Sequence, residues 1–360
     1  MDYMRWAKVH PRVRYELTDS GMPVPKPHEI GADQLGVDLE VKGSYGDPDL
    51  IEILAARYRV DAEGVVLVPG ASSANFIAMA ALLNHGDKIL LEHPVYEPIA
   101  RVADFLGLRV ASFRRQPGFE FGIQIDDLRA GLTPGIRAVM LTNLHNPSGQ
   151  LTTAESMEAI FECCRERNAT LIVDEAYLDA ASLSGAQQLW TAAVFGAEVM
   201  ATSSMTKIYG LSGLRTGWLF TNPELAERAR QVMDLLSVNN AAPAATLARR
   251  AFAHVGNLEG RFRKIHQEGQ GVFREWLSQQ SLLTGYPNHG ALFECLKLPD
   301  GLSSVRLNEV LVADYDTQVV PGHFFGIDDH IRLSLTLPGD DLTEALARIQ
   351  QSVGRLVPRH

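Results

Sequence analysis

The chain has 360 residues, of which 46% are hydrophobic and 21% are charged, and its formal net charge is -10. This length suits two domains or one large domain with an appendage, and the composition is that of a protein with a sizeable buried core. The negative charge argues against binding to nucleic acids or anionic membranes, because both require a basic face.

The three cysteines indicate neither a metal site nor a disulfide framework. Cys163 and Cys164 are adjacent and Cys295 is remote, so the chain has no CxxC pair that would chelate a metal. Residues 1–8 lack the apolar core of a signal peptide, and no apolar run is long enough to span a bilayer. We therefore expect a cytoplasmic protein without a metal site.

The first 40 residues contain four prolines and no sustained periodicity, which predicts an extended arm that lies on another part of the chain. A helix is predicted from about residue 51, where apolar residues recur at helical spacing. Tyr45 stands in the turn before it. From the residues alone, a turn tyrosine packed on its own subunit explains this position.

Residues 65–68 are predicted to form a buried strand that leads through Gly70, Ala71 and Ser72 into an apolar helix. A glycine turn followed by a helix start is a ready anion site, because free backbone N–H groups and the helix dipole favour phosphate. Helix capping alone explains the same residues. Further strands are predicted at 88–92, 109–113 and 138–141, with a short helix from residue 126 between the last two.

The segment Asn146-Pro147-Ser148-Gly149 reads as a turn, and its Asn146–Pro147 bond is a candidate cis peptide. A helix then begins at a capping box in residues 152–155. Its apolar stripe includes Cys164, which assigns this thiol to the core.

Residues 170–173 form an aliphatic run that predicts a fully buried parallel strand, and the run ends in Asp174. Open α/β sheets place ligand contacts at the carboxyl ends of their central strands. An acid at a strand end also caps helices, and Glu175 would serve that purpose equally well. A strand at 199–203 follows after one intervening helix.

Residues 203–218 place Lys207 among small hydroxylated residues, with no other charge beside it. A lysine in an enclosed site can lose its proton and attack a carbonyl carbon, forming a Schiff base. Ser204 and Arg215 offer a hydroxyl donor and a two-pronged cation, which together suit a phosphate. Pyridoxal phosphate requires both features. The alternative is a loop lysine beside a buried arginine.

Ser204-x-x-Lys207 also matches the nucleophile motif of β-lactamase-like enzymes, but the Ser-Asp-Asn and Lys-Thr-Gly motifs that accompany it are absent from the sequence. Beyond Arg215 a strand is predicted at 216–221, followed by helices to about 237, at 243–253 and from 258 to about 280. Short strands and a final amphipathic helix complete the chain. Arg332 lies on an alternating strand, facing away from its aliphatic neighbours.

The stretch around Lys207 resembles the cofactor-lysine signature of class I/II aminotransferases, which are fold type I pyridoxal-phosphate enzymes. About seven ordered landmarks between Tyr45 and Leu337 share the likeness, although the family usually has proline where Leu144 stands. The resemblance implies an α/β fold. It consists of a large domain (45–275) with a mostly parallel, seven-stranded-type sheet between helices, and a smaller α+β domain formed by both chain ends (1–44 and 276–360).

By the same resemblance, Lys207 carries the internal aldimine and Asp174 keeps the pyridine nitrogen protonated. Tyr177 bonds the ring 3-oxygen, as does Asn146, which also contributes to the substrate site. Arg332 clamps the substrate α-carboxylate. The other implied contacts of the cofactor are Ala71, Ser72, Ser204 and Arg215 around the phosphate, Tyr96 against the ring, and Tyr45 from the partner subunit.

We therefore expect an aminotransferase that moves the amino group of an α-amino acid to a 2-oxo acid through a Lys207 aldimine and pyridoxamine phosphate. The resemblance also implies a homodimer with shared active sites. A lyase or decarboxylase of the same fold is the alternative, and a cofactor-sensing transcription regulator is disfavoured because only a short arm precedes the site. Residues 238–241 lack the arginine of dicarboxylate-specific members, which argues against an aspartate-type substrate held that way.

Overall fold

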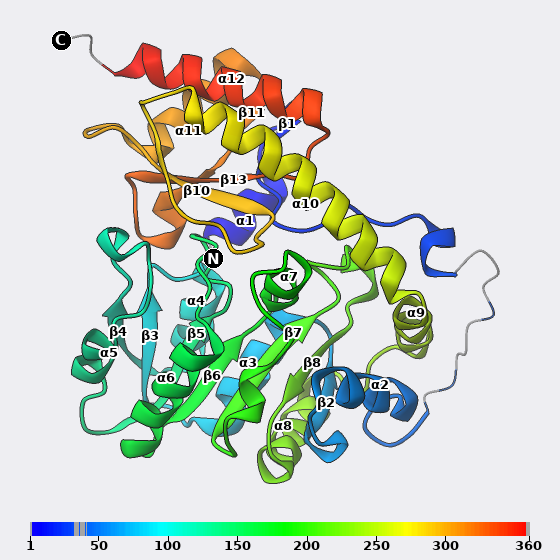
Figure 1. Cartoon of the computed structure of the whole chain (residues 1–360). Coiled ribbons are helices and arrows are strands. Elements are labelled where there is room, and N and C mark those ends of the chain that lie inside the picture. The colour runs from blue at the N-terminus through cyan, green and yellow to red at the C-terminus, as the bar shows by residue number, and fades with distance from the viewer. Residues whose placement is uncertain (1, 32–35, 37–39, 41, 358–360) are drawn as a thin grey trace.

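The computed structural model describes residues 2–31, 36, 40 and 42–357, and within them a seven-stranded sheet forms the centre of the larger body (Figure 1). The strand order is β2-β8-β7-β6-β5-β3-β4. The strands from β7 to β4 run parallel, whereas β8 runs antiparallel to both of its neighbours. The strands are β2 (Val65–Val68), β3 (Lys88–His93), β4 (Arg109–Arg114), β5 (Ile136–Thr142), β6 (Thr170–Asp174), β7 (Val199–Ser204) and β8 (Gly217–Phe220).

Helices cover both faces of this sheet, as its uninterrupted aliphatic strands require. Successive side chains of a strand point to opposite faces, so Leu171 and Val173 enter one core cluster and Ile172 enters the other. Helices α3 (Ala71–Leu82), α4 (Glu97–Phe105) and α8 (Pro223–Leu236) cover one face, and α2 (Pro48–Tyr58), α5 (Ile125–Gly131), α6 (Ala154–Glu166), α7 (Leu178–Leu183) and α9 (Ala242–Ala253) cover the other.

Within the described residues, no helix combines the length and apolarity needed to cross a membrane.

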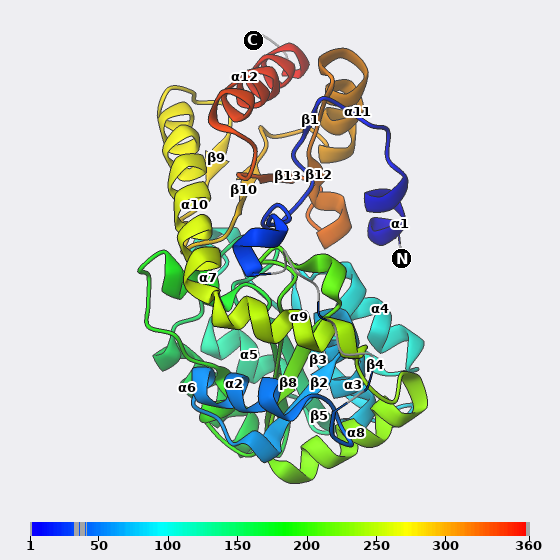
Figure 2. The ribbon, with the colours of Figure 1, turned by 90° about the vertical axis from the view of Figure 1, so that its right-hand side faces the viewer.

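The smaller body contains segments from both ends of the chain (Figure 2). Strand β1 (Tyr15–Glu16) pairs in parallel with β11 (Thr317–Gln318), so segments about 300 residues apart lie side by side. The predicted α/β fold with an α+β appendage is confirmed, while the domain limits at 44/45 and 275/276 stay predictions. The remaining elements are α10 (Val255–Ser278), β9 (Thr284–Gly285), β10 (Phe293–Lys297), α11 (Ser304–Tyr315), β12 (Val320–Pro321), β13 (His330–Ser334) and α12 (Gly339–Leu356).

The amino-terminal segment differs from the predicted extended arm, because residues 2–9 form helix α1 (Asp2–Val9). The carboxylate of Glu97 accepts hydrogen bonds from the backbone N–H groups of Asp2 at 2.9 Å and Tyr3 at 2.7 Å. These are donors that a helix start leaves without an internal partner. The cap comes from a remote residue, so local sequence does not reveal it. The parts of the predicted arm at residues 1, 32–35, 37–39 and 41 lie outside the described residues.

The Asn146–Pro147 peptide is trans, contrary to its prediction as a cis candidate; the cis bonds among the described residues are His93–Pro94 and Asn143–Leu144. The turn around Pro147 is closed by backbone bonds that a trans proline accommodates. The N–H of Gly149 donates to His145 O at 2.7 Å, and the N–H of His145 donates to Gln150 O at 2.9 Å.

Candidate active site

A cavity of about 400 Å³ opens at the carboxyl ends of β5, β6 and β7. Strands that run parallel end at the same edge of a sheet, so residues that follow them in sequence meet there. Most of the predicted site residues line this cavity, namely Ala71, Ser72, Tyr96, Asn146, Asp174, Tyr177, Ser204, Lys207 and Arg215.

Asp174 is the buried acid of the cavity, with 7% of its surface exposed. Its Oδ2 accepts a hydrogen bond from Asn75 Nδ2 at 2.7 Å, and its Oδ1 accepts one from the Ala176 N–H at 3.0 Å. Burial raises the pKa of Asp174, and these two bonds and the charge of Lys207 oppose the rise. A further cation placed against Asp174 would lower this pKa, and the carboxylate would in turn stabilise that cation.

Lys207 follows β7 and turns its amine toward the amino-terminal segment. The amine donates to Ser20 Oγ at 3.1 Å, and the Tyr177 hydroxyl donates to the same oxygen at 2.9 Å. Burial lowers the pKa of Lys207, as does the charge of Arg332, but Tyr177, Asp19 and Tyr3 raise it, and the net pKa lies above the ordinary value. Enclosure alone therefore does not make this amine neutral, and it must lose a proton before it acts as a nucleophile.

The opposite end of the cavity suits an anion. Helix α3 begins after Gly70 without a side-chain cap, and Ser72 and Ser204 add hydroxyl groups. Arg215 donates to the carbonyls of Pro69 and Ser212, both at 3.3 Å, and no carboxylate in the described part of the chain pairs with it. A Cβ at Gly70 would lie 2.6 Å from the Arg215 guanidinium. Only glycine therefore permits this approach.

The backbone of Arg215 has a left-handed conformation, with φ at 48°. For a residue with a Cβ this conformation costs roughly 1 kcal/mol or more. Such strain is concentrated at functional sites, where the surrounding structure holds it. Here the conformation places the guanidinium at the anion end of the cavity.

Arg332 on β13 is buried, with 1% of its surface exposed, whereas an arginine on a strand more often faces solvent. Its Nη1 donates to Asn146 Oδ1 at 2.8 Å, and its Nη2 donates to the Tyr3 hydroxyl at 2.9 Å and Thr18 O at 3.3 Å. Among the described residues, Nε has no hydrogen-bond partner. Three of the five N–H donors of the guanidinium thus go to neutral partners and the Nε–H is left spare, an arrangement that suits a carboxylate.

Tyr3 places helix α1 over Arg332. Its ring lies edge-on to Tyr96 at 5.7 Å and to Phe324 at 5.6 Å, and it also contacts Phe325 at 5.9 Å. These rings separate Arg332 from solvent on the side of α1. A cation shielded in this way interacts more strongly with an opposite charge than an exposed one does.

Two predicted residues do not line the cavity: Arg332, which bonds the cavity residue Asn146, and Tyr45. Tyr45 is 39% exposed, and its hydroxyl donates to Asp234 Oδ2 at 3.4 Å. Within its own chain it therefore contacts α8 rather than the residues around Lys207.

Sequence reasoning missed Tyr3, Ser20 and Asn75. Asn75 had a signal, because it is a polar residue in the otherwise small and apolar sequence of α3. Its Oδ1 accepts from Thr202 Oγ1 at 2.6 Å, which fixes the amide toward Asp174. Tyr3 and Ser20 had none, because their role depends on where the amino-terminal segment packs.

Comparisons with known proteins show the family and the fold of the chain. The family model described as aminotransferase class I and II matches residues 29–349. The arginine–pyruvate transaminase AruH of Pseudomonas aeruginosa is 28% identical over 324 residues, covering 87% of this chain and 82% of that protein. Capreomycidine synthase of Streptomyces vinaceus is 27% identical over 319 residues, covering 86% and 80%. A pyridoxal-phosphate-dependent aminotransferase structure from Streptococcus suis shares the fold, with a TM-score of 0.89 over 99% of this chain and 98% of that chain at 19% identity.

Proposed function

The chain belongs to the aminotransferase class I and II family and uses pyridoxal 5′-phosphate, and we propose that it moves the amino group of an α-amino acid to a 2-oxo acid at Lys207. One observation supports placing this reaction in the cavity. A lysine amine and a buried carboxylate share a single cavity, which also has an anion site at one end. Arg332 adjoins the cavity through Asn146.

The residues of the cavity fit the cofactor. Its phosphate matches the free N–H groups at the start of α3, the hydroxyls of Ser72 and Ser204, and the guanidinium of Arg215. Asp174 offers a buried carboxylate that would stabilise a protonated ring nitrogen. Lys207 offers an amine that would hold the cofactor through its aldehyde.

When bound, the cofactor supplies an electrophilic carbon and a ring that withdraws electrons from the substrate. The remaining steps belong to the protein. Arg332 binds the substrate carboxylate, with Asn146 beside it. The Lys207 amine would take the proton from the substrate α-carbon onto Nζ and deliver it to the electrophilic carbon that the cofactor supplies, while Ser20 orients that amine. Tyr3 on α1 shields Arg332 from water.

A panel of amino donors tests this function. Arginine, valine, aspartate and aromatic amino acids are each mixed with the loaded enzyme, and the absorbance of the cofactor is followed. A productive donor changes the spectrum, and a 2-oxo acid then restores it. We expect aspartate to be a poor donor, because residues 238–241 contain no arginine to hold a second carboxylate.

The same panel distinguishes transamination from lyase or decarboxylase chemistry. Lyase or decarboxylase chemistry is the second candidate function, because one similar protein, capreomycidine synthase, is not named as an aminotransferase. Release of ammonia or carbon dioxide, without restoration of the spectrum by a 2-oxo acid, would overturn the transaminase assignment.

Arg332→Lys is expected to raise KM for the amino donor roughly 10- to 100-fold, with a smaller change in kcat. Lysine keeps the charge but loses the fork geometry, and a hydrogen bond to a charged group is worth about 1.5–3 kcal/mol. Steady-state kinetics measure the effect. Arg348→Lys is the matched control, because this guanidinium lies on α12 and bonds Glu344 and the Tyr315 carbonyl. Equal KM values in both variants would contradict a role of Arg332 in binding the carboxylate.

We also propose that the protein is a homodimer in which Tyr45 reaches the cavity of the partner subunit. Large apolar side chains are exposed near Tyr45 and the cavity, including Phe105 at 80% and Leu235 at 85%. A groove lined by Phe105 and Leu236 shares Ser72 with the cavity. A second copy covering this surface would bury it and bring Tyr45 to the site.

Mixing inactive Lys207→Ala and Tyr45→Ala subunits tests this arrangement. If sites are shared, half of the randomly reassorted dimers contain one intact site, so activity returns to about a quarter of the wild-type level. Mass-tagged subunits confirm that mixed dimers form. Mixed dimers that stay inactive would exclude the exchange of Tyr45 between subunits.

We also propose a cytoplasmic location. It is supported by the free, buried thiols of Cys163, Cys164 and Cys295, a state typical of reducing compartments. Fractionation of cells that express the chain tests this, and recovery outside the cytoplasmic fraction would contradict it.

A further inference from the structure

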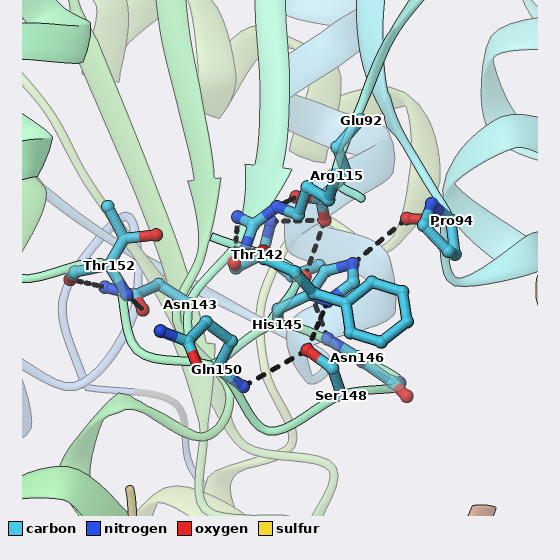
Figure 3. Close-up of polar contacts among 11 residues, drawn as sticks. Glu92, Pro94, Arg115, Thr142, Asn143, His145, Asn146, Ser148, Gln150 and Thr152 are labelled. Carbon is cyan, nitrogen blue, oxygen red and sulfur yellow. Dashed lines mark hydrogen bonds and ion pairs between the residues drawn. The ribbon is translucent and has the colours of Figure 1, made fainter. Parts of the chain in front are cut away.

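A buried ion pair lies beside the cavity without touching it. Arg115 Nε and Glu92 Oε2 are 2.8 Å apart, and their side chains are 0% and 1% exposed (Figure 3). Burial raises the pKa of Glu92 and lowers that of Arg115, and each group opposes the shift of the other. Burying two charges costs more than their attraction returns unless further hydrogen bonds satisfy them. The partners of these further hydrogen bonds therefore indicate the role of the ion pair.

Three of the four further bonds of the pair converge on Thr142, at the end of β5; the fourth runs from Arg115 Nη1 to Phe121 O at 3.4 Å. Glu92 Oε1 accepts hydrogen bonds from the Thr142 N–H at 2.8 Å and from its hydroxyl at 2.6 Å. Arg115 Nη2 donates to the Thr142 carbonyl at 3.3 Å. Because the hydroxyl proton is directed to Glu92, the lone pairs of Thr142 Oγ1 are left to accept. They accept the backbone N–H of Asn146 at 3.1 Å.

Asn146 connects this network to the substrate site. Its side-chain Oδ1 accepts from Arg332 Nη1 at 2.8 Å, and both Thr142 and Asn146 line the cavity. Thr142 pairs with Asp174 across β5 and β6, so its position is fixed relative to the buried acid. The bonds thus run without a break from the ion pair through Thr142 and Asn146 to Arg332.

The other side of the Asn146 turn is also held. Burial brings the pKa of His145 well below the ordinary value, so the ring is neutral. Its Nε2 lies 3.1 Å from Pro94 O and must donate, because a carbonyl only accepts. Its Nδ1 therefore accepts from the Ser148 hydroxyl at 2.6 Å (Figure 3). Because His145 holds this side of the turn, the bond to Thr142 fixes the position of the Asn146 backbone on the other side.

We propose that Thr142 is a positioning residue: oriented by the Glu92–Arg115 pair, its hydroxyl holds the Asn146 backbone so that the Asn146 side chain contacts both Arg332 and the cofactor. This proposal rests on the proposed function of the cavity. It predicts that removing one hydroxyl changes substrate affinity and the protonation of the bound cofactor. A threonine that only stabilised the fold would affect neither.

Thr191 provides a matched comparison. Its hydroxyl donates to the buried Glu175 at 2.7 Å and accepts the Ala193 N–H at 3.4 Å, repeating the bonds of Thr142. It does not line the cavity. Thr142→Val and Thr191→Val therefore remove the same kind of hydroxyl from equally buried surroundings, and we expect similar losses in thermal stability.

The two variants are compared by KM for the amino donor and by the pH midpoint of the absorbance change of the bound cofactor. Thr142→Val should raise KM about 3- to 10-fold and move the midpoint by roughly half to one pH unit, the equivalent of one ordinary hydrogen bond. Thr191→Val should change neither, and Thr142→Ser, which keeps the hydroxyl, should resemble the wild type.

Equal shifts in both valine variants, or no shift in Thr142→Val, would overturn the proposal. If Thr142→Val does not fold, Thr142→Ala removes the hydroxyl without burying a methyl group against Glu92, and the same criteria apply. A wild-type enzyme without transaminase activity would instead refute the proposed function, and the midpoint of the bound cofactor would still test the role of Thr142.

Discussion

Replacing Lys207 with alanine is expected to lower kcat/KM for transamination by at least about 10³-fold, the largest effect of any single substitution in this chain. In the proposed function this amine both holds the cofactor and moves the α-proton, and proton transfer alone contributes about 10²- to 10⁴-fold. Its hydrogen bond to Ser20 places the amine inside the cavity. Activity is measured with the best donor from the panel, at saturating cofactor.

Lys264→Ala is the matched control for this substitution. Lys264 is an exposed lysine on α10, outside the cavity, so its removal should leave kcat/KM within twofold of the wild type. The Lys207→Ala variant should still bind the cofactor through the groups at the start of α3, but more weakly. Activity within tenfold of the wild type would refute the assignment of Lys207.

Asp174→Asn is expected to lower kcat/KM on the order of 10²-fold. The substitution keeps the shape of the side chain and removes its charge. A buried carboxylate shifts the pKa of an adjacent cation by about 1–3 units, and each unit corresponds to a factor of ten. Without that charge a nitrogen facing Asp174 would lose its proton near neutral pH. The pH dependence of the bound-cofactor spectrum should therefore change together with the rate.

Glu175→Gln is the control for Asp174, because it is the next residue and equally buried. Its carboxylate points to Thr191 Oγ1 at 2.7 Å and the Ala192 N–H at 2.6 Å, away from the cavity. Burial raises the pKa of Glu175 to about 8, so glutamine resembles its protonated form at neutral pH. We expect at most a small change in rate. If both variants lost activity equally, loosening of the strand end rather than loss of charge would be the cause.

Much of the larger body could be predicted because its signals are local. The aliphatic run at residues 170–173 has the length of a strand and ends at Asp174, and β6 occupies Thr170–Asp174. The helix with Cys164 in its apolar stripe was visible from its spacing, and that thiol is buried. The strand pattern reflects burial of both faces and the helix pattern burial of one face, and neighbouring residues in the sequence record both directly.

The helix at residues 2–9 was missed for the opposite reason. Its start is stabilised by the Glu97 carboxylate, and its Tyr3 is held by Arg332. A short helix of this kind gains most of its stability from tertiary packing rather than from its own propensity. Tyr3, Trp6 and Ala7 do recur at helical spacing, but eight residues are too few for this spacing alone to distinguish a helix from an arm.

Residue types and their spacing are enough to predict the alternation of strands and helices, the family, and the lysine, acid and arginines of the proposed site. The contacts of Ser20 with Lys207, of Tyr3 with Arg332 and of Thr142 with Asn146 are seen in the folded chain alone. These contacts join segments that folding brings together, and a hydrogen bond between remote groups depends on distance and direction in space. Neither the distance nor the direction can be read from the order of the residues.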